Sequence, residues 1–170
     1  MQADTRLGPL VNAAQHASVM RYYEEAGRTG SVVALGCPQG DLHPEGCFVT
    51  PSLAIGQPRG GRITREEVFG PLITVEPFDD VDDAIALAND SDFGLMASAW
   101  TNRADLGHRI AREVVAGSIT IMSSSDAAAA SAPDFVNAYI EPQKQSGHGL
   151  DGGVPGLLAY TTAQSVNWLN

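Results

Sequence analysis

The feature that most constrains the fold of this chain is an alternation of short apolar runs with longer amphipathic segments. The short runs have the length and residue types of strands, and the clearest are Ser31–Leu35, Leu72–Phe78, Met96–Trp100 and Ser118–Ile121. Segments with helical spacing precede or separate them, from about Asn12 to Glu25, after Asp83, and from Ala104 to Val115. Strands separated by helices of this length pair in parallel through crossovers. The pattern therefore predicts an α/β fold with a mostly parallel sheet and flanking helices.

Local chemistry places the ends of the predicted helices. Asn12 suits the N-cap of the first helix, and Gly27 can end that helix. Asp80, Asp82 and Asp83 come just before the apolar run of the second helix. Carboxylates in a first turn are favoured by the positive end of the helix dipole. We interpret these aspartates as a helix start rather than as a metal site.

The remaining segments are less regular. Cys47–Thr50 and Leu53–Ile55 are predicted to be extended pieces broken by Pro51. Gly156–Tyr160 is predicted to form a short helical turn, and Ser165–Leu169 a terminal strand. No internal repeat and no linker divides the sequence, so we predict one domain over residues 1–170.

Composition excludes several classes of function. The formal net charge of −10 argues against electrostatic binding to nucleic acid or to an anionic membrane surface. No run of about 18 apolar residues occurs, so no transmembrane helix is predicted. No apolar stretch follows a basic start, so a signal peptide is not expected either. These patterns favour a cytoplasmic protein.

Two cysteines, Cys37 and Cys47, lie in a Gly/Pro-rich stretch with His43 between them. A disulfide or a metal site can be drawn from these residues. Their spacing matches no zinc signature, however, and a structural zinc site normally needs four ligands. We therefore favour two reduced cysteines that flank a turn.

Residues Arg65–Pro71 read Arg-Glu-Glu-Val-Phe-Gly-Pro, which resembles the E-E-x-F-G-P signature of the aldehyde dehydrogenase superfamily. Six further motifs of that family have counterparts here, in the family's order. They lie at Gly8–Gln15, Phe78–Asn89, Phe93–Thr101, Ala116–Ile119, Lys144–Gly149 and Ala159–Thr161. The chain is thus similar to the part of the catalytic domain that follows the nucleophile, through the terminal oligomerisation strand.

The resemblance implies two cofactor-binding residues, Glu67 and Phe69. In the family, the second Glu of the signature holds the hydroxyls of the nicotinamide ribose, and the Phe packs beside the nicotinamide ring. The implied cofactor is NAD or NADP. The resemblance assigns no catalytic residue and no metal ligand, because the family's nucleophilic Cys, its general base and its dinucleotide-binding half have no counterpart in this sequence. Neither Cys37 nor Cys47 lies at the place of the nucleophile.

We therefore expect the isolated chain to be inactive and not to retain NAD(P), since one ribose contact does not repay the cost of association. Two hypotheses follow. In the first, the chain is one part of an aldehyde dehydrogenase that works beside a complementary chain. In the second, it is a non-catalytic association module that joins itself or a full-length relative, because an unpaired apolar edge strand is a template for pairing. Both predict a homo-oligomer or a complementary aldehyde dehydrogenase chain as partner.

Two stretches depart from the family or mimic another motif. Tyr139–Pro142 replaces the family's P-F-G-G, so a normal aldehyde pocket is not expected. Gly147–Gly152 satisfies G-x-G-x-x-G, the dinucleotide fingerprint. That fingerprint needs a strand before it and a helix after it, whereas this segment is predicted to be a loop. We therefore assign no nucleotide site to it.

Overall fold

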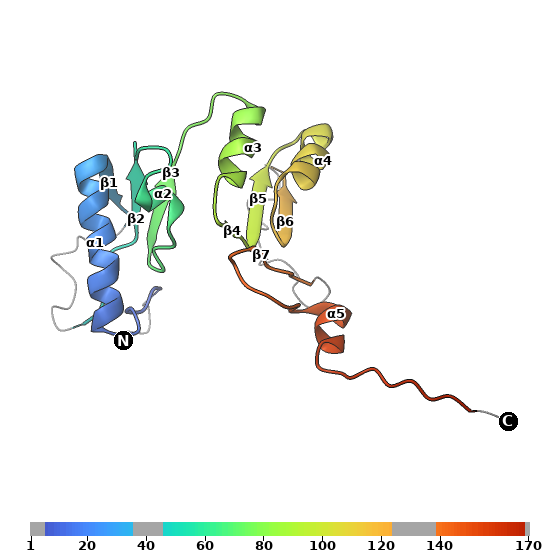
Figure 1. The fold of residues 1–170 in the computed structure, drawn as a ribbon. Coiled ribbons are helices and arrows are strands. Elements are labelled where there is room, and N and C mark those ends of the chain that lie inside the picture. The colour runs from blue at the N-terminus through green and yellow to red at the C-terminus, as the bar shows by residue number, and fades with distance from the viewer. Residues whose placement is uncertain (1–5, 36–45, 124–138, 169–170) are drawn as a thin grey trace. The chain divides into compact units, whose positions relative to one another are not determined.

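Three small sheets organise the part of the chain that the computed structural model describes, residues 6–35, 46–123 and 139–168 (Figure 1). The chain forms two compact units, Met1–Pro77 and Phe78–Asn170. Whether these units fold together as one domain over residues 1–170 stays a prediction. Within the described ranges, every helix is too short or too polar to cross a membrane.

The first unit places helix α1 (Ala13–Thr29) against a three-stranded sheet. The strands are β1 (Ser31–Ala34), β2 (Ser52–Ile55) and β3 (Leu72–Val75), in the spatial order β1-β2-β3. β1 pairs with β2 antiparallel, with Val33 opposite Leu53, and β2 pairs with β3 parallel, with Leu53 opposite Ile73. The four-residue helix α2 (Arg62–Arg65) lies in the connection between β2 and β3.

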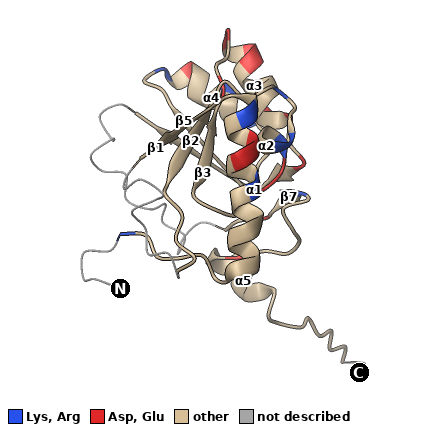
Figure 2. Cartoon of the chain, turned by 90° about the vertical axis from the view of Figure 1, so that its left-hand side faces the viewer, with Lys and Arg blue, Asp and Glu red and all other residues tan. Residues whose placement is uncertain are grey.

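The core of this unit is formed by one face of the sheet and the two helices. It contains Tyr22 and Ala26 from α1, Ala54 from β2, Ile63 from α2 and Leu72 from β3. Side chains alternate between the two faces of a strand, so the neighbouring residues point to the opposite face. That outer face is apolar and exposed, and it includes Val33, Ile55, Ile73 and Val75. The three strands carry no charged residue and are tan throughout in Figure 2.

The second unit contains three helices and two short pairs of strands in its described part. The helices are α3 (Val81–Asn89), α4 (Ala104–Glu113) and α5 (Gly153–Leu158). The strands are β4 (Phe93–Gly94), β5 (Met96–Trp100), β6 (Ser118–Met122) and β7 (Gln143–Lys144). β5 and β6 pair in parallel, and β4 and β7 pair antiparallel.

The α/β class is confirmed, but the prediction of a mostly parallel sheet is wrong. The crossover rule holds where the two strands flanking a helix share a sheet, as β5 and β6 do around α4. It does not apply to β3 and β5, which precede and follow α3 in the sequence, because these strands belong to different sheets. β1, moreover, is antiparallel to its neighbour. The sheets are therefore small and mixed.

Two predicted helix starts are confirmed by their caps. The Asn12 side chain accepts a hydrogen bond from the Gln15 N–H, and the Asp80 side chain accepts one from the Asp83 N–H. The predicted end at Gly27 is wrong, since α1 continues to Thr29 and is capped by Gly30. An added Cβ at Gly27 would meet no atom within 4 Å, so nothing at that position interrupts the helix.

Three predicted strands also differ from the structure. The run Ser31–Leu35 reads as a buried strand, yet β1 has an exposed side: Val33 is 45% exposed because it lies on the outer face of the sheet, with Ile55 of the central strand. Cys47–Thr50 forms no strand. The terminal strand expected at Ser165–Leu169 is absent from its described part, residues 165–168, which is exposed. A strand exists only through hydrogen bonds to a neighbour, and no partner strand pairs with these residues in the described ranges.

Candidate functional site

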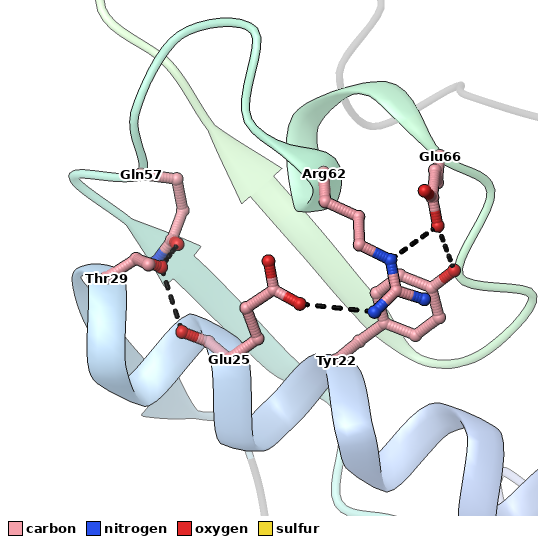
Figure 3. Close-up of polar contacts among 6 residues, drawn as sticks. All are labelled: Tyr22, Glu25, Thr29, Gln57, Arg62 and Glu66. Carbon is pink, nitrogen blue, oxygen red and sulfur yellow. Dashed lines mark hydrogen bonds and ion pairs between the residues drawn. The ribbon is translucent and has the colours of Figure 1, made fainter.

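The candidate site is residues 66–71, which connect α2 to β3. Its first acid, Glu66, is held by two donors. The Tyr22 hydroxyl donates to Glu66 Oε2 at 2.7 Å, and Arg62 Nε donates to the same oxygen at 2.8 Å (Figure 3). The pKa of the Glu66 carboxyl lies below its ordinary value, chiefly because Tyr22 donates to the carboxylate and secondly because Arg62 does. Glu66 is therefore committed to contacts within the protein.

Arg62 connects this carboxylate to α1. Its guanidinium carbon lies 4.4 Å from the centre of the Tyr22 ring, and Nη1 donates to Glu25 Oε2 at 3.3 Å. The pKa of the Tyr22 phenol is raised, first because its hydroxyl donates to Glu66 and then because of burial. Tyr22, Glu25, Arg62 and Glu66 form one group, which we call the Glu66 cluster (Figure 3).

The second acid, Glu67, is exposed like Glu66 but lacks its hydrogen-bond partners. The backbone at Glu66 is extended, with φ −88° and ψ 153°, so successive side chains point to opposite sides. Because the Glu66 side chain reaches α1, the Glu67 side chain faces away from it. Glu67 is exposed and makes no hydrogen bond or ion pair with any described residue. Its carboxylate is therefore available to a ligand.

Phe69 is exposed and its backbone is strained. The side chain is 74% exposed, and φ is 52°, a left-handed conformation that costs a non-glycine residue energy. The Gln15 side chain donates through Nε2 to the main-chain oxygen of Phe69 at 3.0 Å, which helps to hold this conformation. Strain retained at an exposed aromatic residue points to a functional role.

Gly70 and Pro71 are fixed from α1. A Cβ at Gly70 would lie 2.7 Å from Cγ2 of Val19, a side chain with no exposed surface, so only glycine fits. The Tyr23 hydroxyl lies 2.7 Å from the Thr50 oxygen and 2.9 Å from the Pro71 oxygen, so its one hydrogen is shared between these two acceptors. Burial raises the pKa of the Tyr23 phenol. The segment is therefore held on both sides of Phe69.

Two of the motifs noted in the sequence meet at a cavity in the first unit. The cavity has a volume of about 430 Å³ and is lined by Leu7, Gly8, Pro9, Leu10, Val49, Gly70 and Pro71. The Leu10 N–H also donates to the Cys47 oxygen at 2.8 Å, which ties the first motif to the chain before β2. The lining is apolar and borders the segment that carries Glu67 and Phe69. A cavity of about 360 Å³ in the second unit, between α3, β5 and α4, has no charged residue in its lining.

Of the residues in the cysteine prediction, the structure describes only Cys47. Cys47 is a free, half-buried thiol, whereas Cys37 and His43 lie outside the described residues. Within the described ranges, no group of His, Cys, Asp and Glu side chains is placed to hold a metal ion.

The glycine-rich stretch and the Lys-Gln-Ser motif serve the fold of the second unit. Lys144 Nζ donates to the oxygen of Asn89, the last residue of α3, at 2.9 Å and to the Ser91 oxygen just beyond the helix at 2.8 Å. The Ser146 hydroxyl accepts the Gly94 N–H. Gly147, Gly149 and Gly152 all have positive φ and lie in the connection between β7 and α5. The prediction that no strand precedes and no helix follows this stretch is therefore wrong, although β7 has only two residues and α5 only six.

The residues that hold the segment were not among the predicted site residues. Glu67 was singled out and Glu66 was given no role of its own, whereas the structure ties Glu66 to Tyr22 and Arg62. The i,i+4 spacing of Arg62 and Glu66 was a signal for their ion pair. Tyr22 and Gln15 gave no such signal, because they lie 44 and 54 residues from their partners.

Comparison with known proteins extends the sequence resemblance. The model of the aldehyde dehydrogenase family matches residues 1–166. Betaine aldehyde dehydrogenase of Brucella anthropi is 34% identical over 172 residues, covering 95% of this chain and 32% of that protein. The 2-hydroxymuconic semialdehyde dehydrogenase of Pseudomonas sp. (strain CF600) is 32% identical and is likewise covered to 32% of its length. The chain thus spans about a third of the length of the curated relatives it matches.

Solved structures agree with this relationship. Betaine aldehyde dehydrogenase of Staphylococcus aureus, in complex with NAD⁺, matches with a TM-score of 0.78 and 30% identity, over 100% of this chain and 35% of that chain. The aldehyde dehydrogenase KauB of Pseudomonas aeruginosa matches with a TM-score of 0.80 and 30% identity, over 93% of this chain and 30% of its own.

Proposed function

This chain belongs to the aldehyde dehydrogenase family, and from that membership we propose that it supplies the nicotinamide-ribose contacts of an NAD(P)-dependent aldehyde dehydrogenase. The reaction would oxidise an aldehyde to a carboxylate. The observation that carries this proposal is a difference within the signature. Glu66 is hydrogen-bonded to α1 and α2, whereas Glu67 has no such partner among the described residues and Phe69 is exposed.

The two exposed residues fit a nicotinamide riboside. The Glu67 carboxylate has only acceptor oxygens, which suit the two hydroxyl donors of a ribose. The Phe69 ring offers an apolar face for the nicotinamide ring, and its fixed backbone limits where that face can lie. A bound NAD or NADP would supply the hydride acceptor for the oxidation. The contribution of this chain is to bind and orient that end of the cofactor.

The proposal includes the place of the chain in the family fold. We assign it to the part that follows the nucleophile, since its seven motifs correspond to that part in order. Its relatives are about three times as long, so the thiolate and the pyrophosphate and adenine sites would come from the remaining two thirds. By this proposal, residues 1–170 alone do not turn over an aldehyde.

A test uses the chain joined to the other two thirds of an aldehyde dehydrogenase. Glu67→Ala should raise the Michaelis constant for NAD(P) about tenfold or more, because it removes a charged acceptor from two hydroxyl donors. Glu24→Ala is the matched control, because Glu24 is exposed on α1 and makes no hydrogen bond or ion pair with a described residue. Equal Michaelis constants for the two variants would refute the assignment of Glu67.

A second proposal, association without catalysis, is supported by exposed apolar surface. Val33, Ile55, Ile73 and Val75 on the outer face of the first sheet are 40–60% exposed. Trp168, near the end of the chain, is 89% exposed. Such surface favours contact with another chain. The partner we propose is a second copy or a complementary aldehyde dehydrogenase chain.

A further inference from the structure

We propose that Arg62 is a positioning residue, which acts through Glu66 to keep Glu67 and Phe69 in the orientation that meets the nicotinamide ribose. This inference rests on the proposed function and names how the site is built. Arg62 itself would not touch the cofactor.

Arg62 has the contacts that this role requires. Its guanidinium reaches Glu66 Oε2, Glu25 Oε2 and the face of the Tyr22 ring (Figure 3). A planar guanidinium holds several partners in a fixed fork, so it fixes their mutual geometry more tightly than a lysine can. Tyr22 and Glu25 belong to α1, whereas Glu66 begins the candidate segment. Arg62 therefore ties the segment to the longest helix of the unit.

The helix that carries Arg62 cannot hold this position alone. α2 has four residues, and a helix of this length is unstable unless other contacts stabilise it. Ile63 is its buried residue and Val68 packs against the same core, so polar contacts are left to hold the Glu66 side chain between them. The Arg62–Glu66 pair spans α2 from its first residue to its C-cap. Loss of Arg62 would therefore loosen the start of the segment.

Charge supports the same role. Glu66 and Glu67 are adjacent carboxylates of like sign. Arg62 and Tyr22 both satisfy Glu66 on the α1 side of the backbone, which leaves Glu67 on the other side. Without Arg62, Glu66 would lose a charge-assisted hydrogen bond, and its carboxylate could turn toward solvent beside Glu67. The two carboxylates would then lie close together and repel each other.

The first test measures the order of the segment in the full chain without cofactor. Hydrogen–deuterium exchange at the Glu66 N–H, which donates to the Arg62 oxygen at 2.8 Å, should be about tenfold faster in Arg62→Gln than in the wild type, as followed by NMR. Arg109→Gln is the matched control, because Arg109 also pairs with a glutamate at i,i+4, Glu113, at 3.0 Å. Unchanged exchange in Arg62→Gln would overturn the positioning role, whatever the outcome for the cofactor.

The second test is a double-mutant cycle in the chain joined to the rest of an aldehyde dehydrogenase. Arg62→Gln should raise KM for NAD(P) about tenfold and leave kcat within about twofold of the wild-type value. KM of Arg62→Lys should lie between those of the wild type and Arg62→Gln. In the Glu67→Ala background, Arg62→Gln should add less than about twofold, because the residue through which it acts is gone. A loss of general stability would instead lower the active fraction in both backgrounds.

The outcomes separate the two proposals. A full additional effect of Arg62→Gln in the Glu67→Ala background, or no effect in the wild-type background, overturns the role of Arg62. An unchanged KM in Glu67→Ala overturns the proposed function instead, and the exchange measurement then still decides whether Arg62 orders the segment.

Discussion

Gly70 packs directly against Val19. A Cβ at Gly70 would lie 2.7 Å from Val19 Cγ2 and 2.9 Å from Val19 Cγ1, both closer than carbon atoms can approach. Val19 has no exposed surface, so it cannot move into solvent. This contact brings the end of the family signature against α1, next to the exposed Phe69.

Gly70→Ala should destabilise the chain by about 1–3 kcal/mol, the usual cost of overpacking a filled core. Urea unfolding followed by circular dichroism measures this change. Gly27→Ala is the matched control, because Gly27 lies within α1 and an added Cβ meets no atom within 4 Å. That control should be neutral or stabilise by up to about 1 kcal/mol. Equal stability of the two variants would contradict the contact.

The Glu66 carboxylate should make the free energy of unfolding depend on pH. Its folded pKa lies below the unfolded value, chiefly because of the Tyr22 hydroxyl, so its contribution is full above about pH 5 and is lost as the pH falls through the folded pKa. Glu66→Gln should therefore be less stable than the wild type at neutral pH, and the difference should shrink toward pH 3. Unfolding midpoints measured at a series of pH values test this.

Glu24→Gln provides the comparison for that series. Glu24 is exposed on α1, and its carboxylate makes no hydrogen bond or ion pair with a described residue. Its pH profile should therefore follow that of the wild type. A Glu66→Gln profile parallel to the wild type at every pH would show that the carboxylate charge does not stabilise the Glu66 cluster.

The sequence predicted best where structure depends on neighbouring residues. Asn12 and Asp80 each cap a helix by accepting an N–H only three residues away. Sheet pairing depends on strands that are distant in sequence, and the parallel sheet was wrong for that reason. Glu67 and Phe69 were singled out by resemblance alone, whereas the feature that separates Glu67 from Glu66 depends on Tyr22, 44 residues away from Glu66. No local pattern encodes that contact.

Lys144 is the only lysine in the chain, and it should stabilise the second unit. Its ammonium donates to two carbonyl oxygens at and beyond the end of α3, where a positive charge also suits the helix dipole. Lys144→Met should cost about 1 kcal/mol in chemical denaturation. Arg21→Met, an exposed change on α1, should stay within about 0.5 kcal/mol of the wild type. An equal effect of both changes would argue against a stabilising role for the Lys144 ammonium at the end of α3.

The outer face of the first sheet should mediate association. Ile73 is 60% exposed on this face, so Ile73→Lys should weaken self-association by placing a charge in an apolar contact. Analytical ultracentrifugation across a concentration series measures the change. Val154→Lys, which alters an exposed apolar residue of α5, is the comparison. A wild-type chain that stays monomeric at all concentrations would contradict this prediction.

The most direct test of the account is NADH or NADPH formation from a panel of aldehydes, by residues 1–170 alone and by the same residues joined to the remaining two thirds of an aldehyde dehydrogenase. We predict no turnover by the chain alone, and turnover by the joined protein that falls in Glu67→Ala. Turnover by the purified chain alone, with a covalent adduct trapped on Cys37 or Cys47, would contradict the account.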